Sequence, residues 1–307
     1  MSRMRKKGVW ICVMLAAMLL TLCGGCVPAY AAGTVTRTTE MDLTTMTTTA
    51  DHLSNEGWKW EPTADGGTLT LRGFYMKADH ATPYPHALIQ GKGNVVIVLE
   101  GENVIETTSS WYWPLLSGDG KTVNWTIREG EKGGSLEFKM PESTAKNHLP
   151  YGMAGEKVTI ESGTIRAKMI LSMSDSFEMT GGTVIIDGTR SGAAIETMKD
   201  DAILTGGKLK ITGGGYGISA RCMDNWPPEK RKIVIDGADV EIKSDVCALI
   251  GNPILYLNGN LNISGGTRAA SSPIQTTING TGNCRLSIPV APAWKSLKFT
   301  LPWPLTD

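Results

Sequence analysis

The chain has 307 residues, of which 41% are hydrophobic and 20% charged, and its 30 basic and 30 acidic residues balance. This balance excludes the strongly basic surface on which nucleic-acid-binding proteins depend. The length is sufficient for one large domain with a sizeable buried core.

The first 32 residues are predicted to be a signal peptide. A basic start, MSRMRKK, precedes an apolar run of 15 residues, GVWICVMLAAMLLTL, which is short for a membrane span. The sequence AYA at 29–31 then predicts cleavage after Ala31 or Ala32. Removing the four leader cations leaves 26 basic against 30 acidic residues, a net charge of −4. An alternative interpretation takes LCGGC as a degenerate lipobox with Cys26 lipidated. Both interpretations predict a secreted or cell-surface protein.

Two terminal segments flank the part of the chain that carries a repeat. The Thr-rich segment 33–56 is interpreted as a spacer or an N-terminal cap. Segment 271–307, whose prolines would block further strand pairing, is interpreted as a C-terminal cap. After the leader, no further apolar run is long enough to span a membrane. The remaining cysteines are too few for a disulfide framework, although a bridge between Cys222 and Cys247 stays open.

Between these segments one short phrase recurs, an apolar-x-apolar pair followed by a Gly-containing turn. MTGGTVIIDG at 179–188 and LTGGKLKITG at 204–213 are two copies. Five residues after most of the anchors comes a second apolar pair, such as Val184 and Ile186. The second copy departs from this spacing and is expected to place Ile105 inside through a bulge. The anchors, the last apolar residue of each copy, are Leu71, Leu99, Ile127, Ile160, Met179, Leu204, Ile235 and Leu257.

Alternation over three to five residues is the periodicity of a β-strand. Strands this short cannot each bury a face alone, but coils of a solenoid bury them jointly by stacking. A third apolar segment in each copy, such as YGISA at 216–220, gives every coil three faces. The sequence therefore predicts an all-β fold, a parallel β-helix of about eight coils over 57–270, in preference to a β-sandwich.

Two segments carry a resemblance to a known family. GWKWEPTADGGTLTLRGF (57–74) and VVIVLEGENVI (95–105) resemble secreted bacterial repeat proteins of the Firmicutes type that are described as carbohydrate-binding-domain-like. The resemblance covers about residues 57–265. It implies a right-handed parallel β-helix on a secreted or cell-surface protein that binds carbohydrate or mediates adhesion. Long insertions and a missing wall anchor depart from the family's pattern and leave the mode of surface attachment open.

Long loops at one corner of the first three coils, 77–86, 106–114 and 139–151, are rich in aromatic residues and histidine. Because coils stack in register, these side chains are expected to form one ridge. Aromatic faces stack on sugar rings while polar groups at the rim bind hydroxyls. In the competing interpretation Trp111 and Trp113 only cap the hydrophobic ends of the loops. The predicted polysaccharide site is Trp111, Tyr112, Trp113, Tyr84, His86, His148 and Tyr151, with His80 and Asn147 beside it.

Polysaccharide lyases and hydrolases use the same architecture, so catalysis is the main alternative. Cleavage of a glycosidic bond by hydrolysis needs paired carboxylates. The candidate acids follow strands as turn residues do and show no pairing in the sequence: Asp187, Asp200, Asp201, Asp236 and Asp239. The histidines lack the close spacing of a metal site. We therefore expect binding without catalysis, metal or cofactor. A degradative β-helical enzyme and a structural spacer without ligand stay open, as does the oligomeric state.

Overall fold

The computed structural model describes residues 34–78, 87–108, 114–118, 122–141, 151–188, 192–222, 229–256, 258–271, 275–277, 284–287 and 298–300. All regular elements in these ranges are β-strands, and most of them pair in parallel. Within the same ranges, no helix is long and apolar enough to cross a membrane.

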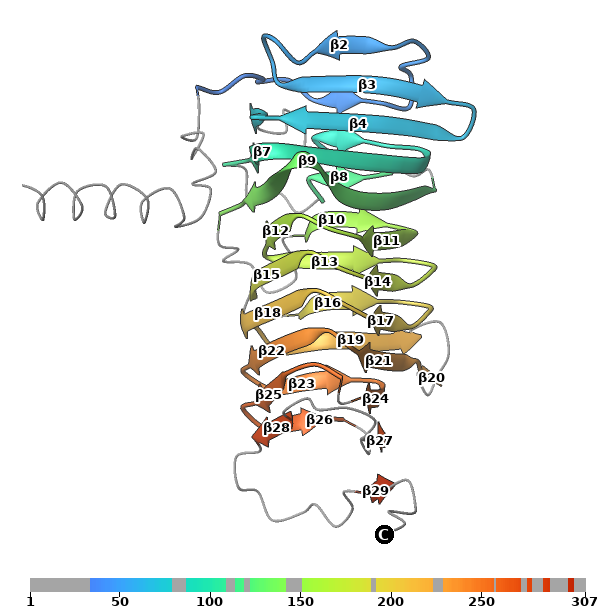
Figure 1. Cartoon of the computed structure of the whole chain (residues 1–307), viewed down its shortest axis with the longest axis vertical. Coiled ribbons are helices and arrows are strands. Elements are labelled where there is room, and N and C mark those ends of the chain that lie inside the picture. Colours follow the sequence, from blue (N-terminus) through green and yellow to red (C-terminus); the bar gives the residue numbers. More distant parts are fainter. Residues whose placement is uncertain are drawn as a thin grey trace, which may run out of the picture. The chain divides into compact units, whose positions relative to one another are not determined.

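One ladder of parallel strands contains the predicted anchors from Leu71 to Ile235, while Leu257 lies outside the described residues (Figure 1). Its members, paired in this order, are β4 (Gly66–Arg72), β7 (Gly93–Glu106), β9 (Val123–Lys139), β11 (Lys157–Ile160), β14 (Phe177–Met179), β17 (Ala202–Leu204), β21 (Lys232–Asp236) and β24 (Asn252–Tyr256). β27 (Gln275–Thr277) and β29 (Lys298–Thr300) continue it. We call this ladder the first column.

A second column follows each strand of the first across a glycine corner. It comprises β5 (Tyr75–Lys77), the second halves of β7 and β9, β12 (Thr164–Ala167), β15 (Thr183–Gly188), β18 (Lys208–Gly213), β22 (Asp239–Ser244), β25 (Leu261–Gly265) and β28 (Cys284–Ser287). The expected irregularity in the second copy is present, because the β7–β9 register shifts between Leu99 and Gly101 while Ile105 is fully buried.

A separate sheet forms the third face. Its strands are β1 (Met41–Asp42), β6 (Ile89–Gln90), β8 (Leu116–Ser117), β10 (Tyr151–Gly155), β13 (Met169–Ser172), β16 (Ala193–Thr197), β19 (Tyr216–Cys222), β23 (Cys247–Ile250) and β26 (Arg268–Ala270). β20 (Glu229–Lys230) pairs with β19 at its side. The predicted all-β architecture of parallel strands is confirmed, in an arrangement consistent with a parallel β-helix.

The inward side chains of the first column stack as predicted, with a correction at both ends. Ile127, Ile160, Met179, Leu204 and Ile235 are confirmed as one buried pile. The pile continues at Leu69 and Ile97 on one side, so the anchors Leu71 and Leu99 are wrong by two residues, and on the other side Leu255 is the partner of Ile235 where Leu257 was expected. Side chains alternate with period two along a strand, and a slip of two residues therefore keeps the same face inward.

The corner between the two columns explains why the phrase repeats. Gly163, Gly182 and Gly207 occupy equivalent positions, directly before the second-column strand, with φ of +86°, +72° and +79°, where side chains are strained. Gly237, with φ of +88°, lies one position earlier in its coil, and Ala238 takes the equivalent place. A Cβ on Gly182 would lie 2.6 Å from the carbonyl oxygen of Gly163, and one on Gly207 would lie 2.6 Å from that of Gly182. The coils that contain Gly182 and Gly207 therefore need glycine both to turn and to approach the coil before them.

The N-terminal segment closes the first coil on all three faces. β2 (Ala50–His52) pairs antiparallel with β3 (Trp58–Thr63), and β3 pairs antiparallel with β4. β1 adds to the third sheet, and Arg37 bridges to Met76 of the second column. Trp58 and Trp60 are 3% and 2% exposed, so the end of the core is covered. We call residues 34–63 the N-terminal cap.

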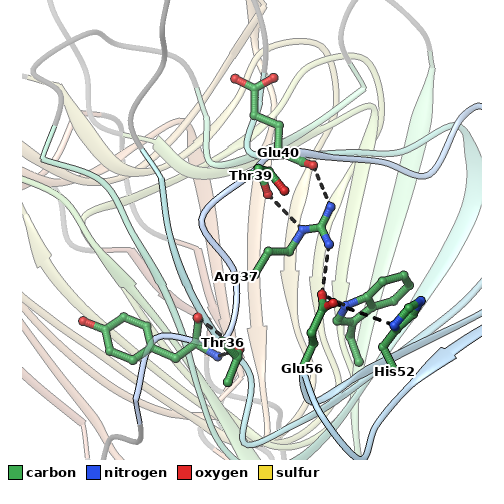
Figure 2. Close-up of polar contacts among 8 residues, drawn as sticks. Thr36, Arg37, Thr39, Glu40, His52 and Glu56 are labelled. Atoms are coloured by element: carbon green, nitrogen blue, oxygen red, sulfur yellow. Dashed lines mark hydrogen bonds and ion pairs between the residues drawn. The ribbon is translucent and has the colours of Figure 1, made fainter.

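Arg37 holds this cap together, as Figure 2 shows. Its Nη1 donates to Glu56 Oε2 at 3.0 Å, while Nε and Nη2 each donate to a backbone carbonyl oxygen at 2.9 Å. Trp58 Nε1 also donates to Glu56, at 2.8 Å, and the His52 ring stacks on Trp58 with centroids 4.4 Å apart. The hydrogen bond from Trp58, followed by the contact with Arg37, lowers the pKa of Glu56 below its ordinary value.

Candidate functional site

A groove of about 530 Å³ lies along the glycine corner and crosses five successive coils. Glycines 163, 182, 207 and 237 form part of its lining, together with Glu129, Ser162, Thr164, Thr183, Lys208 and Asp239. The glycines follow strands of the first column and the polar residues from Thr164 onward begin strands of the second. The groove therefore lies where the two columns meet in these five coils.

Polar side chains from Thr164 to Asp239 stand in register along the second-column edge of this groove, and Ser135 continues their row one coil earlier, outside the lining. Ser135, Thr164, Thr183, Lys208 and Asp239 are successive backbone partners in parallel strands. Their spacing is therefore that of neighbouring strands, about 4.8 Å. The residue after each of them is buried in the core, and strand alternation points the polar group outward. We call these five residues the polar column.

Backbone hydrogen bonds between coils fix the groove. The N–H groups of Thr183, Lys208 and Asp239 donate to the carbonyl oxygens of the corner glycines one coil earlier, at 2.7, 2.9 and 2.9 Å. At one end the N–H of Glu129 donates to Ser162 Oγ at 2.9 Å. A ladder of this kind orders the polar column before any ligand arrives, which reduces the entropy cost of binding.

A second hollow, of about 430 Å³, shares Thr183, Lys208 and Asp239 with the groove and extends it over the outer face of β15, β18 and β22. Lys210 Nζ lies 3.6 Å from Glu241 Oε2 in this hollow. Asp239 Oδ1 accepts hydrogen bonds from the backbone N–H and from Nδ2 of Asn260, at 2.9 and 3.0 Å. The two hollows are therefore continuous through these three shared residues, and Ile185, Leu209 and Val240 add apolar surface to the second.

The predicted aromatic ridge is mostly beyond what the structure describes. Tyr151 begins β10, and its Oη donates to Glu196 Oε2 at 2.9 Å, two strands away in the third sheet. Burial first, and then the Glu196 carboxylate, raises the pKa of Tyr151 well above its ordinary value, so the phenol stays a neutral donor. The ridge stays a prediction, because its other members lie outside the described residues: Tyr84, His86, Trp111, Tyr112, Trp113 and His148, with His80 and Asn147.

Candidate acids of the enzyme alternative hold turns between coils. Asp200 Oδ1 accepts from the N–H of Asp201 at 2.7 Å, and Asp201 Oδ1 accepts from the N–H of Lys232 at 2.6 Å. Asp236 accepts from Asn258 Nδ2. Side chains used in this way satisfy backbone and loop donors, which is the ordinary use of Asp at a turn.

Neither a disulfide nor a metal cluster is found in the described ranges. Cys247 carries a thiol, whose Sγ donates to the Leu249 carbonyl oxygen at 3.3 Å. Cys247 is the register partner of Tyr216, at the opposite end of β19 from Cys222, so these two cysteines are not bridged. Nowhere in the same ranges do three His, Cys, Asp or Glu side chains gather as a metal site requires.

Comparison of the chain with protein-family models, with curated proteins and with solved structures gave no match.

The polar column was missed because its members look like ordinary solvent-facing strand residues. A signal was nevertheless present in the repeated phrase. Gly163-Thr164 and Gly182-Thr183 place a hydroxyl directly after the corner glycine in two successive copies. A polar residue at one fixed position of every coil must form a column once coils stack.

Proposed function

We propose that this protein binds carbohydrate without cleaving it, as a secreted or cell-surface protein, and that the glycan lies along the groove at the glycine corner. The observation that carries the proposal is the repeat of the polar column at the strand spacing, about 4.8 Å. One pyranose residue advances an extended glycan by a similar length. Each sugar therefore meets an equivalent polar group as the chain passes from coil to coil.

The chemistry of the groove fits hydroxyl-rich ligands. Threonine hydroxyls donate and accept hydrogen bonds, and carboxylates accept from neighbouring sugar hydroxyls. An extended peptide advances about 3.3 Å per residue and loses register with the column after one or two residues. The glycine floor has no side chains, which leaves room for a polymer to lie close to the backbone.

The proposal includes a finer description of the fold, a right-handed β-helix of about eight coils. Eight successive strands from β4 to β24 in the first column support the number of coils. The hand is supported by the general rule that about 98% of crossovers between parallel strands of one sheet are right-handed.

The positions of the carboxylates favour binding over hydrolysis. Glu129 and Asp239 lie four coils apart in the groove, about 19 Å, whereas glycosidases place their pair about 5–9.5 Å apart. Asp239 and Glu241 are closer, two residues apart on one face of β22. They lie beside hydrogen-bond donors of Asn260 and the cation of Lys210, unlike the apolar pocket that keeps a general acid protonated.

A groove-filling substitution tests the site. Thr183→Trp places an indole over the middle of the polar column, and we expect it to abolish binding on a glycan array. Thr212→Trp is the matched control, because Thr212 is exposed on β18 outside both hollows. Equal binding by Thr183→Trp and the parent, with equal thermal unfolding, would refute the groove. Trp111→Ala and Trp113→Ala in the same assay test the aromatic ridge as the alternative site.

A product assay separates binding from catalysis. Incubation with the polysaccharides that bind should release neither reducing ends nor unsaturated sugars. Release of product that Asp239→Asn or Glu241→Gln abolishes would replace the binding proposal with the degradative enzyme.

A further inference from the structure

The charges along the groove select a class of glycan. Within the two hollows the lining contains the cations Lys208 and Lys210 and the anions Glu129, Asp239 and Glu241. Each lysine has an acid as its register partner in the next strand, Asp239 for Lys208 and Glu241 for Lys210. The surface therefore offers no run of positive charge along the direction in which a polymer would lie.

A polyuronate carries one carboxylate on every sugar and would place one anion at each coil. Thr164 and Thr183, successive members of the polar column in the groove, present hydroxyls to such a chain instead of cations. At one end of the groove it would meet Glu129, which is exposed, and at the other Asp239. Like charges at both ends of the groove, whose two lysines each stand beside an acid, oppose association by steering as well as by contact.

We infer that the groove takes a neutral, hydroxyl-rich glycan and excludes polyuronates and other acidic polysaccharides, an inference that rests on the proposed glycan-binding function. Hydroxyls of the polar column bind sugar hydroxyls without a charge on the ligand. The lysine–acid pairs serve as donor–acceptor pairs for adjacent sugar hydroxyls rather than as anion sites.

The test compares one polysaccharide backbone with and without its carboxylate charge. Polygalacturonate and its fully methyl-esterified form share a backbone, and affinity electrophoresis with both, beside neutral xylan and β-glucan, measures the preference. We expect retardation by at least one neutral polymer, little by polygalacturonate, and little dependence of neutral binding on salt.

Charge variants sharpen the test. Glu129→Gln and Asp239→Asn should each raise the affinity for polygalacturonate about fivefold at low salt, since a unit charge at close range in water is worth about 1 kcal/mol. Asp187→Asn is the control, because Asp187 is exposed on β15 outside both hollows. Preference for polygalacturonate over its ester would overturn this inference while leaving glycan binding intact. Binding to no polymer of the panel would overturn the proposed function, and the inference with it.

Discussion

The N-terminal cap and the glycine-corner groove use polar residues in opposite ways. In the cap, Glu56 accepts hydrogen bonds from Arg37 and Trp58, and Arg37 also donates to a backbone carbonyl oxygen. These polar groups hold one segment of the cap against the next. In the groove, backbone hydrogen bonds hold the coils and the side chains of Thr183 and Lys208 point outward. The comparison shows how a repeat fold leaves a polar surface for a ligand. In the groove the backbone hydrogen bonds suffice to hold the coils, whereas the cap adds side-chain bonds to its strand pairing.

The largest effect is expected at the glycine corner. Gly207→Ala puts a Cβ 2.6 Å from backbone atoms of the preceding coil at a φ of +79°, and we expect a loss of about 3 kcal/mol or more in urea unfolding. Gly73→Ala is the control, since Gly73 has φ of +61° but nothing within 4 Å of the added Cβ. It should cost about 1–2 kcal/mol. Equal losses would show that coil stacking does not require the glycine.

A smaller loss is expected when the cap loses its central side chain. Arg37→Ala removes three hydrogen bonds of a side chain only 17% exposed, and it should destabilise the protein by about 1–3 kcal/mol in urea. Glycan binding in the groove should be unchanged, because the cap stands apart from its lining. Lys59→Ala, which removes an exposed pairing with Glu61, should have no measurable effect. If Arg37→Ala loses glycan binding at a temperature where it stays folded, the assignment of stability to the cap and of binding to the groove is wrong.

Acid should weaken the cap through Glu56. Its pKa in the folded protein lies below the unfolded value, about 4.3, so its contribution is complete above that value and is lost as pH falls through the folded pKa. The free energy of unfolding measured in urea should therefore change less between neutral and acid pH for Glu56→Gln than for the parent. Glu61→Gln is a matched change at an exposed position, and its free energy of unfolding should depend on pH as the parent's does.

The smallest effect is expected at Tyr151. Tyr151→Phe removes one hydrogen bond to Glu196 and should cost about 1 kcal/mol in thermal or urea unfolding. If the aromatic ridge is the glycan site, the same change also weakens binding. Unchanged binding by Tyr151→Phe agrees with the groove.

The inward half of this fold could be predicted from the sequence. Alternation at Val184 and Ile186 and the repeated corner glycines are local signals, and they specify which residues face the core. The β3–β4 hairpin was read as part of a coil, although the Asp65-Gly66 turn is a hairpin signal.

The groove could not be predicted in the same way. It depends on the angle between two strand columns and on the register between coils, and no local pattern encodes either. Thr164 and Thr183 are 19 residues apart in the sequence and become neighbours only through the β12–β15 pairing.

The most direct test of the central claim is a length series of neutral oligosaccharides, from cellobiose and xylobiose to the octaoses, titrated calorimetrically against the protein. If sugars occupy successive coils, affinity rises with each added unit and levels off near the length of the groove, about five sugars for the five coils it crosses. An affinity already complete at one or two sugars, or one independent of Thr183, would contradict a ligand that lies along the stacked coils.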